Sequence, residues 1–168
     1  MNLIAAVDEN WGIGKDGGLL FHIPEDRKYF KEKTIGKVVV MGRGTFASLP
    51  GGRPLLGRTN IVLSADPSFR PEGVILARSI GGLKRMLQEY DSNTVFVIGG
   101  ASLYNRLLES CRYAYITKVE CGANADRFMH TLDGRAGWRL IERSAPGNYN
   151  GLAFTFNVYE NSDVKPIE

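Results

Sequence analysis

Short apolar runs alternate with helical segments over roughly the first two thirds of the chain, and this alternation constrains the fold more than any other feature. The apolar runs are predicted to be buried strands at residues 2–7, 37–41, 60–64, 73–77 and 94–98. Helices are predicted at residues 24–34, 44–48, 79–90 and 100–109. Alternation of strands and helices favours an α/β fold with a largely parallel sheet.

The pattern changes after Cys111. Residues 113–120, 138–144 and 152–160 alternate as strands without an intervening helix, which predicts antiparallel additions at one edge of the sheet. The polar tail that follows carries Pro166 and is expected to fray. A length of 168 residues fits one domain, which we place at residues 1–160 with a tail at 161–168.

Composition excludes several classes of protein. A net charge of +3 without a dense run of Lys or Arg gives no nucleic-acid footprint. Two cysteines are too few for a disulfide scaffold. The cysteines show no metal-ligand spacing and only two histidines accompany them, so no metal site is expected. Neither a signal peptide nor an apolar run of about 18 residues is present. We expect a soluble, cytoplasmic monomer.

Two predicted strands end in glycine-rich turns that lead into helices. Gly42-Arg43-Gly44-Thr45 follows the strand at 37–41, and Gly99-Gly100-Ala101-Ser102 follows the strand at 94–98. Glycine lets the backbone approach a ligand closely, and the carboxyl edge of a parallel sheet is where ligands bind. Two such turns could hold the two phosphates of a dinucleotide, or they could simply make tight turns. Neither contains the G-x-G-x-x-G fingerprint.

Two arginines indicate which dinucleotide the turns would bind. Arg43 stands in the first turn, and Arg78 follows the strand at 73–77. A guanidinium suits a 2′-phosphate, which favours NADP over NAD. The alternative is that each arginine is a solvated surface residue.

Asp26 has an unusual place for an acid. Pro24 suits the first position of the helix at 24–34, so Asp26 shares a face with Ile23 and Phe30. A carboxylate on an apolar stripe could be a pocket acid that binds a cationic or amidine-like ligand and takes part in proton transfer. It could instead complement the positive end of the helix, as Glu25 does.

Several segments together resemble one family. They are Leu3–Val7, Ile13-Gly14, Ile23-Pro24-Glu25-Asp26 with Phe30, Met41–Phe46, Gly52–Asn60, Val97–Tyr104 and Tyr115-Ile116-Thr117. In order and spacing, this pattern resembles dihydrofolate reductase over residues 3 to about 160. The resemblance implies a single-domain α/β fold with a central mixed, mostly parallel eight-stranded sheet and about four flanking helices.

The resemblance also implies an activity, which is reduction of 7,8-dihydrofolate to tetrahydrofolate with NADPH. Asp26 would bind the 2-amino group and N3 of the pterin, and its charge would help N5 take a proton. Thr117 would hydrogen-bond that carboxylate, while Phe21 and Leu19 would complete the catalytic set. Dihydrofolate and antifolate inhibitors are the implied ligands.

The remaining site residues follow from the same resemblance. Substrate contacts are expected from Ile4, Ala5, Arg27, Phe30, Leu49, Leu55, Arg58 and Ile98, in addition to Asp26 and Thr117. Arg58 would take the α-carboxylate of the substrate's glutamate, with Arg53 as a nearby competitor. Cofactor contacts are expected from Ala6, Ile13, Gly14, Gly42, Arg43, Gly44, Thr45, Leu63, Ser64, Arg78, Ile98, Gly99, Gly100, Ala101, Ser102, Leu103 and Tyr104. A cis Gly99–Gly100 peptide and a mobile loop at residues 14–20 are also implied.

Four positions depart from the family pattern. Phe21 stands where tryptophan is usual, so it cannot donate an indole N–H to a water beside the substrate. His22 could titrate near neutral pH or be an idle surface residue. Leu20 replaces a frequent proline, and Arg27 could reach toward the substrate tail or face water. These changes leave sensitivity to diaminopyrimidine inhibitors open.

Two other functions remain as alternatives. One is a reductase of the same fold that acts on another heterocycle, such as the pyrimidine of riboflavin synthesis. The other is a non-catalytic protein that binds NADP or sequesters antifolates. The Asp26 helix and the segment around Arg58 argue against the first alternative, and Asp26, Thr117 and both glycine turns argue against the second.

Overall fold

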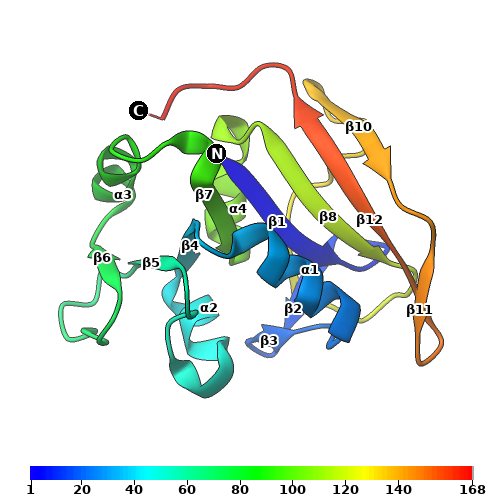
Figure 1. Ribbon diagram of the computed structural model, residues 1–168, viewed down its shortest axis with the longest axis horizontal. Coiled ribbons are helices and arrows are strands. Elements are labelled where there is room, and N and C mark those ends of the chain that lie inside the picture. The colour runs from blue at the N-terminus through cyan, green and yellow to red at the C-terminus, as the bar shows by residue number, and fades with distance from the viewer. Residues whose placement is uncertain (168) are drawn as a thin grey trace.

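The computed structural model describes residues 1–167. Its main sheet is built from β1 (Asn2–Val7), β4 (Val38–Gly42), β5 (Thr59–Leu63), β6 (Ile75–Ala77), β7 (Val95–Gly99), β8 (Tyr113–Val119), β10 (Trp138–Arg143), β11 (Gly147–Tyr149) and β12 (Leu152–Asn161). Eight of these strands lie side by side in the order β10-β12-β8-β1-β7-β4-β5-β6, and β11 pairs with β12 (Figure 1). The fold is the predicted mixed, mostly parallel α/β fold.

Four α-helices flank the sheet. They are α1 (Pro24–Thr34), α2 (Arg43–Ser48), α3 (Ile80–Leu87) and α4 (Ala101–Leu107), with short 3₁₀ turns at Pro50–Gly52, Ser92–Thr94 and Leu108–Ser110. Each helix was predicted, with its ends shifted by at most three residues. The start of α3 is set by Ser79, whose hydroxyl accepts a hydrogen bond from the Gly82 N–H.

Apolar side chains are buried on both faces of the sheet, as expected for parallel strands between helices. In β4, Val38 and Val40 pack in the cluster that contains Leu83 of α3 and Leu103 of α4. Val39 and Met41 point to the opposite face and pack with Phe46 of α2. Figure 1 shows α1 in front of the sheet and α4 behind it. The strands therefore form a rigid layer whose carboxyl ends carry the glycine turns.

One prediction about strand direction was wrong. Residues 113–120 were expected to join the sheet as an antiparallel strand, but β8 pairs with β1 in parallel, from Asn2 opposite Tyr113 to Val7 opposite Lys118. The physical reason is that α4 separates β7 from β8, so this connection is a crossover. The antiparallel additions are β12, which pairs with β8, and β10, which pairs with β12.

The tail is held in place where fraying was expected. The Lys165 N–H donates to Glu109 O at 2.8 Å, and Gln88 Nε2 donates to Ile167 O at 2.7 Å. Ile167 also packs against the main core, so an apolar side chain near the chain end supplies the burial that a polar tail would lack. Glu168 lies outside the described residues.

A second, three-stranded sheet was not predicted. It consists of β2 (Gly12–Lys15), β3 (Gly18–Leu19) and β9 (Arg127–Phe128), in the order β3-β2-β9. Asp16 and Gly17 connect β2 to β3 with φ values of 52° and 78°, which suit a type I′ hairpin turn. The segment implied to be a mobile loop at residues 14–20 includes this hairpin turn and β3. None of the helices in residues 1–167 has the length and apolar character needed to cross a membrane.

Candidate active site and cofactor cleft

The two glycine turns lie next to each other at the carboxyl edge of the sheet. β4 and β7 are parallel neighbours, and a Cβ placed on Gly42 would lie 3.9 Å from the Gly100 nitrogen. The Gly99–Gly100 peptide is cis, as the resemblance implied. Gly99 has a φ of 134°, and a Cβ there would lie 3.0 Å from Thr45 Oγ1. Only glycine fits a backbone packed this closely.

A cavity of about 400 Å³ opens beside these turns. Eight of the predicted cofactor residues line it, namely Gly42, Gly44, Thr45, Leu63, Gly100, Ala101, Ser102 and Leu103. Arg106 and Arg127 complete the lining, so the walls carry two positive charges and no carboxylate. The composition of the cavity wall suits an anionic ligand.

Arg106 and Arg127 were missed by the sequence predictions. Arg106 lies on α4, one helical turn beyond Ser102, and this spacing could have identified it. Arg127 comes from β9, which follows the predicted strand at 113–120 and carries no motif. Only the folding of β9 against β2 brings Arg127 to the cavity.

The predicted adenosine end of the cleft is a tight polar cluster. Arg43 Nη1 lies 2.6 Å from Asp66 Oδ2, and the guanidinium stacks 5.0 Å from the centre of the Phe69 ring. Arg78 donates to the carbonyls of Ser64, Asp66 and Phe69. Hydrogen bonds from Ser68, and then the Arg43 guanidinium, hold the pKa of Asp66 below its ordinary value. The structure brings both predicted arginines to one loop, at residues 64–69.

The predicted catalytic pair is formed. Thr117 lies on β8 with 2% exposure, and its hydroxyl donates to Asp26 Oδ1 at 2.6 Å. Burial raises the pKa of Asp26, and the Thr117 hydrogen bond opposes that rise. The positions flanking Asp26 on α1, Glu25 and Arg27, are exposed. Asp26 is therefore a desolvated carboxylate aimed inward rather than a surface acid at a helix end.

β1 passes beside this pair between β7 and β8. Ala6 is in register with Thr117, which places the predicted contacts Ile4 and Ala5 on the same strand segment. Tyr104 is buried, and its hydroxyl donates to Ile4 O at 2.7 Å. Burial, and then the charge of Asp26, raise the pKa of Tyr104. Tyr104, a predicted cofactor contact, thus packs between α4 and β1 and does not line the cavity beside the turns.

The predicted apolar wall is also assembled. Leu49, Leu55 and Ile98 pack against the cluster of Val39, Met41, Phe46 and Val62 and stay half-buried. Phe30 is half-buried on α1, on the same side of the helix as Asp26. Half-burial leaves these side chains a surface for a flat ring to contact.

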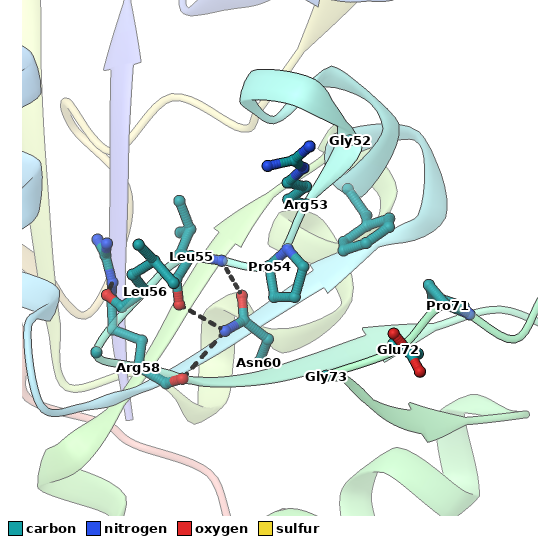
Figure 2. Close-up of a pocket in the computed structure, with 12 residues that line it drawn as sticks. Gly52, Arg53, Pro54, Leu55, Leu56, Arg58, Asn60, Pro71, Glu72 and Gly73 are labelled. Carbon is teal, nitrogen blue, oxygen red and sulfur yellow. Dashed lines mark hydrogen bonds between the residues drawn. The ribbon is translucent and has the colours of Figure 1, made fainter.

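Arg58 is anchored at the far end of α1. Its Nη1 lies 3.2 Å from Thr34 Oγ1, and its Nε donates to Leu56 O at 2.9 Å. Partial burial lowers the pKa of Arg58 from its ordinary value. Asn60 is buried and bonds both the N–H and the carbonyl of Leu55 and the carbonyl of Arg58, which fixes this segment (Figure 2).

A second cavity, of about 580 Å³, lies against the same segment. Leu55 and Arg58 line it together with Arg53, Pro54 and Glu72, among others (Figure 2). Asp26, Thr117 and the glycine turns are not part of its wall. The larger cavity therefore lies apart from the Asp26–Thr117 pair, which is distinguished by its desolvated carboxylate instead.

The hairpin of β2 and β3 is fastened at two points. The Asp126 N–H donates to Gly14 O, and Asp126 Oδ2 accepts from the Asp16 N–H, both at 3.0 Å. At the base, the buried Asp8 carboxylate accepts from the N–H groups of Asn10, Gly12 and Ala123 at 2.8–3.1 Å. The predicted contacts Ile13 and Gly14 lie within this hairpin, on β2.

Leu19 and the residues after it differ in burial. Leu19 is 63% exposed at the end of β3, opposite Gly14. Phe21 is half-buried and packs with Ile23, Val119 and Phe154, so its ring is part of a core cluster. His22 is exposed. Within residues 1–167, no three His, Cys, Asp or Glu side chains group closely enough to hold a metal ion.

Comparisons with known proteins show the family of this chain. A family model described as dihydrofolate reductase matches residues 1–161. The dihydrofolate reductase type 3 of Salmonella typhimurium is 41% identical over 86% of each chain, and the dihydrofolate reductase of Bacillus subtilis is 34% identical over 97% of this chain and 95% of that protein. A solved dihydrofolate reductase from Enterococcus faecalis, complexed with NADP(H) and RAB-propyl, superposes with a TM-score of 0.84 at 34% identity, over 96% of both chains. The chain therefore belongs to the dihydrofolate reductase family.

Proposed function

We propose that this chain reduces 7,8-dihydrofolate to 5,6,7,8-tetrahydrofolate with NADPH, and that Asp26 is its catalytic carboxylate. The observation that carries the proposal is the hydrogen bond of 2.6 Å from the buried Thr117 hydroxyl to the half-buried, desolvated Asp26 carboxylate, in a chain of this family. A protein that only bound a nucleotide would have no use for a desolvated carboxylate outside the nucleotide cleft, and burying one costs stability.

The residues around the two glycine turns fit the cofactor. The cavity wall has no carboxylate, and at Gly99 a φ of 134° and a Cβ contact of 3.0 Å to Thr45 Oγ1 favour glycine. Gly42–Thr45 and Gly99–Leu103 would hold the phosphate region, while Arg43, Ser64 and Arg78 would meet the adenosine end. Ala6, Ile13, Gly14 and Ile98 would surround the nicotinamide. When bound, NADPH supplies a hydride from the nicotinamide C4 to the pterin C6.

Asp26 would hold the pterin and assist its protonation. Its carboxylate would accept hydrogen bonds from the 2-amino group and N3, and its negative charge would make N5 more basic. The charge acts strongly because the carboxylate is desolvated. Thr117 keeps the carboxylate oriented and favours its ionised form. The proton for N5 would come from water.

The other substrate contacts follow the length of the bound molecule. Ile4 and Ala5 would border the pterin beside Asp26, and Phe30, Leu49 and Leu55 would pack on its rings. Arg58 would bind the α-carboxylate of the glutamate with a bidentate geometry. Arg27 is exposed on α1 and would lie near the rim of the cleft.

We also propose a location, an oligomeric state and domain bounds for the enzyme. We infer a cytoplasmic monomer with no nucleic-acid partner, in which residues 1–160 form the reductase domain and 161–168 a tail. Antifolate inhibitors are expected to compete with dihydrofolate for the Asp26 cleft, since they too present amidine-like groups to a carboxylate.

The test measures oxidation of NADPH in the presence of dihydrofolate, monitored as the loss of absorbance at 340 nm. The same assay is run with NADH in place of NADPH. We expect rapid turnover with NADPH and slow turnover with NADH. Folded protein that binds NADPH but leaves dihydrofolate unreduced would favour the alternative functions, a reductase of another heterocycle or a sequestering protein.

A further inference from the structure

We propose that Arg127, together with Arg106, binds the diphosphate that bridges the two nucleosides of the cofactor. The inference rests on the proposed function, because it concerns how that cofactor is held. Both side chains line the cavity of about 400 Å³ beside the glycine turns, although they come from β9 and α4, which are far apart in the sequence.

The charge of the cavity matches this ligand. Of the ten residues that line it, Arg106 and Arg127 are the only charged ones, and the others are small, apolar or hydroxyl-bearing. A bridging diphosphate carries two negative charges at neutral pH. Guanidinium groups bind such oxygens through paired N–H donors, which are stronger than neutral hydrogen bonds. Two arginines facing two phosphates would neutralise the bound group.

Neither guanidinium is committed to a close acidic partner in the part of the chain that the structure describes. Arg106 forms no ion pair among residues 1–167. Arg127 is 70% exposed; its Nη1 donates to the exposed Asp126 O at 3.1 Å and lies 4.0 Å from the Asp126 carboxylate. In contrast, Arg43 already lies 2.6 Å from Asp66. Arg127 can therefore turn to an anion at small cost, since an exposed ion pair of this kind is weak.

Arg127 also connects the cavity to the hairpin of β2 and β3. It is in register with Gly14 in the pairing of β9 with β2, and the adjacent Asp126 bonds Gly14 O and the Asp16 N–H. An anion held by Arg127 would fix β9 and so stabilise the hairpin that borders the nicotinamide. Diphosphate binding and hairpin order would then favour each other.

Two probes separate the diphosphate from the rest of the cofactor. Adenosine 2′-monophosphate lacks the bridging diphosphate, whereas 2′-phospho-ADP-ribose carries it and lacks the nicotinamide. Calorimetry would measure the Kd of each probe for the wild type, Arg127→Gln, Arg127→Lys and Arg139→Gln. Arg139 is the matched control, because its side chain is 77% exposed on β10, at the far edge of the sheet.

We expect Arg127→Gln to raise the Kd of 2′-phospho-ADP-ribose by about tenfold and to leave the Kd of adenosine 2′-monophosphate unchanged. Arg127→Lys should recover part of the loss, and Arg139→Gln should bind as the wild type does. Hydrogen exchange should show that 2′-phospho-ADP-ribose protects residues 12–19 less in Arg127→Gln than in the wild type.

Equal affinities of wild type and Arg127→Gln for 2′-phospho-ADP-ribose would overturn the diphosphate role and leave the proposed function intact. An equal loss for both probes would overturn it as well, because Arg127 would then act on the site as a whole. A wild-type chain that binds neither probe would overturn the proposed cofactor itself.

Discussion

Asp26 differs from its neighbours on α1 in being desolvated. Glu25, Arg27 and Lys28 are exposed, whereas Asp26 turns inward to the Thr117 hydroxyl. The helical period placed Asp26 with Ile23 and Phe30, so its inward direction could be predicted from the sequence. Thr117 could not, because an isolated threonine in a strand most often reflects β-sheet preference. The role of Thr117 could be expected only from the family resemblance. Its distance from Asp26 is set by the fold.

Removing the Thr117 hydroxyl should shift the pH dependence of catalysis. In Thr117→Val the ionised Asp26 loses a hydrogen bond, so the pKa of Asp26 rises further above its ordinary value. We expect the acidic limb of the kcat/KM profile to move to higher pH and the rate at neutral pH to fall about tenfold. Thr117→Ser, which keeps the donor, is the control. A Thr117→Val profile that coincides with the wild type would contradict the pairing.

The stability of the folded chain should depend on Asp26 with a definite sign. Because burial raises the folded pKa, this carboxyl contributes stability that is fully present below its unfolded pKa and lost as pH rises through the folded pKa. At neutral pH, Asp26→Asn should therefore raise the Tm by a few degrees. Thermal unfolding at neutral pH and at pH about 3 should show the gain only at neutral pH. A lower Tm at neutral pH would mean that Asp26 stabilises the fold.

Phe21 tests whether an indole N–H matters in this cleft. The Phe21 ring packs with Ile23, Val119 and Phe154 and has no donor to offer a water beside the substrate. Phe21→Trp should lower the KM for dihydrofolate or raise kcat, because an ordered water would be restored near the pterin. Steady-state kinetics on both forms measures this. Identical kcat and KM values would show that the substitution at this position is neutral.

At the level of elements, apolar periodicity predicted the four helices and eight strands, because most of them bury apolar side chains in the core. It missed β2, β3, β9 and β11, which have two to four residues each, and all of these except β9 contain glycine. Such strands are held by tertiary hydrogen bonds rather than by local preference, so no window of sequence identifies them. The predicted direction of β8 was wrong because α4 makes the connection from β7 a crossover, which leaves β8 parallel to β1.

The Asp8 carboxylate should be essential to the hairpin base. Asp8→Ala leaves the N–H groups of Asn10, Gly12 and Ala123 without their acceptor. Since Asp8 and Gly12 are buried, we expect a loss of about 3 kcal/mol in the free energy of unfolding and faster hydrogen exchange across residues 8–19. Urea denaturation gives the first value. Asp8→Asn keeps one acceptor oxygen, so its free energy of unfolding should lie between those of the wild type and Asp8→Ala. An Asp8→Ala variant as stable as the wild type would contradict this role.

At the scale of the whole molecule, the cleft depends on neighbours that are distant in sequence. The alternation of strands and helices predicted that both glycine turns would lie at one edge of the sheet, and β4 and β7 are indeed adjacent. Arg127 could not be placed in this way, because its position depends on how the segment after β8 folds back onto β2. The cavity wall thus combines predictable turns with residues that only the fold brings in.

Cofactor binding should stabilise the whole chain. At about 100 times its Kd, NADPH should add about 2.7 kcal/mol to the free energy of unfolding and raise the Tm by several degrees. NADH at the same concentration should stabilise less, because it lacks the 2′-phosphate that Arg43 and Arg78 would bind. Differential scanning fluorimetry compares the two. Equal shifts with NADH and NADPH would contradict the assignment of these arginines.

The central claim is that the desolvated Asp26 carboxylate is required for reduction of dihydrofolate, and one comparison tests it most directly. Turnover of NADPH with dihydrofolate at 340 nm would be measured for wild type and Asp26→Asn, beside the Kd of each for NADPH. The account predicts that Asp26→Asn loses most of its turnover near neutral pH and binds NADPH as the wild type does. Wild-type turnover by the variant, or an equal loss of turnover and NADPH binding, would contradict it.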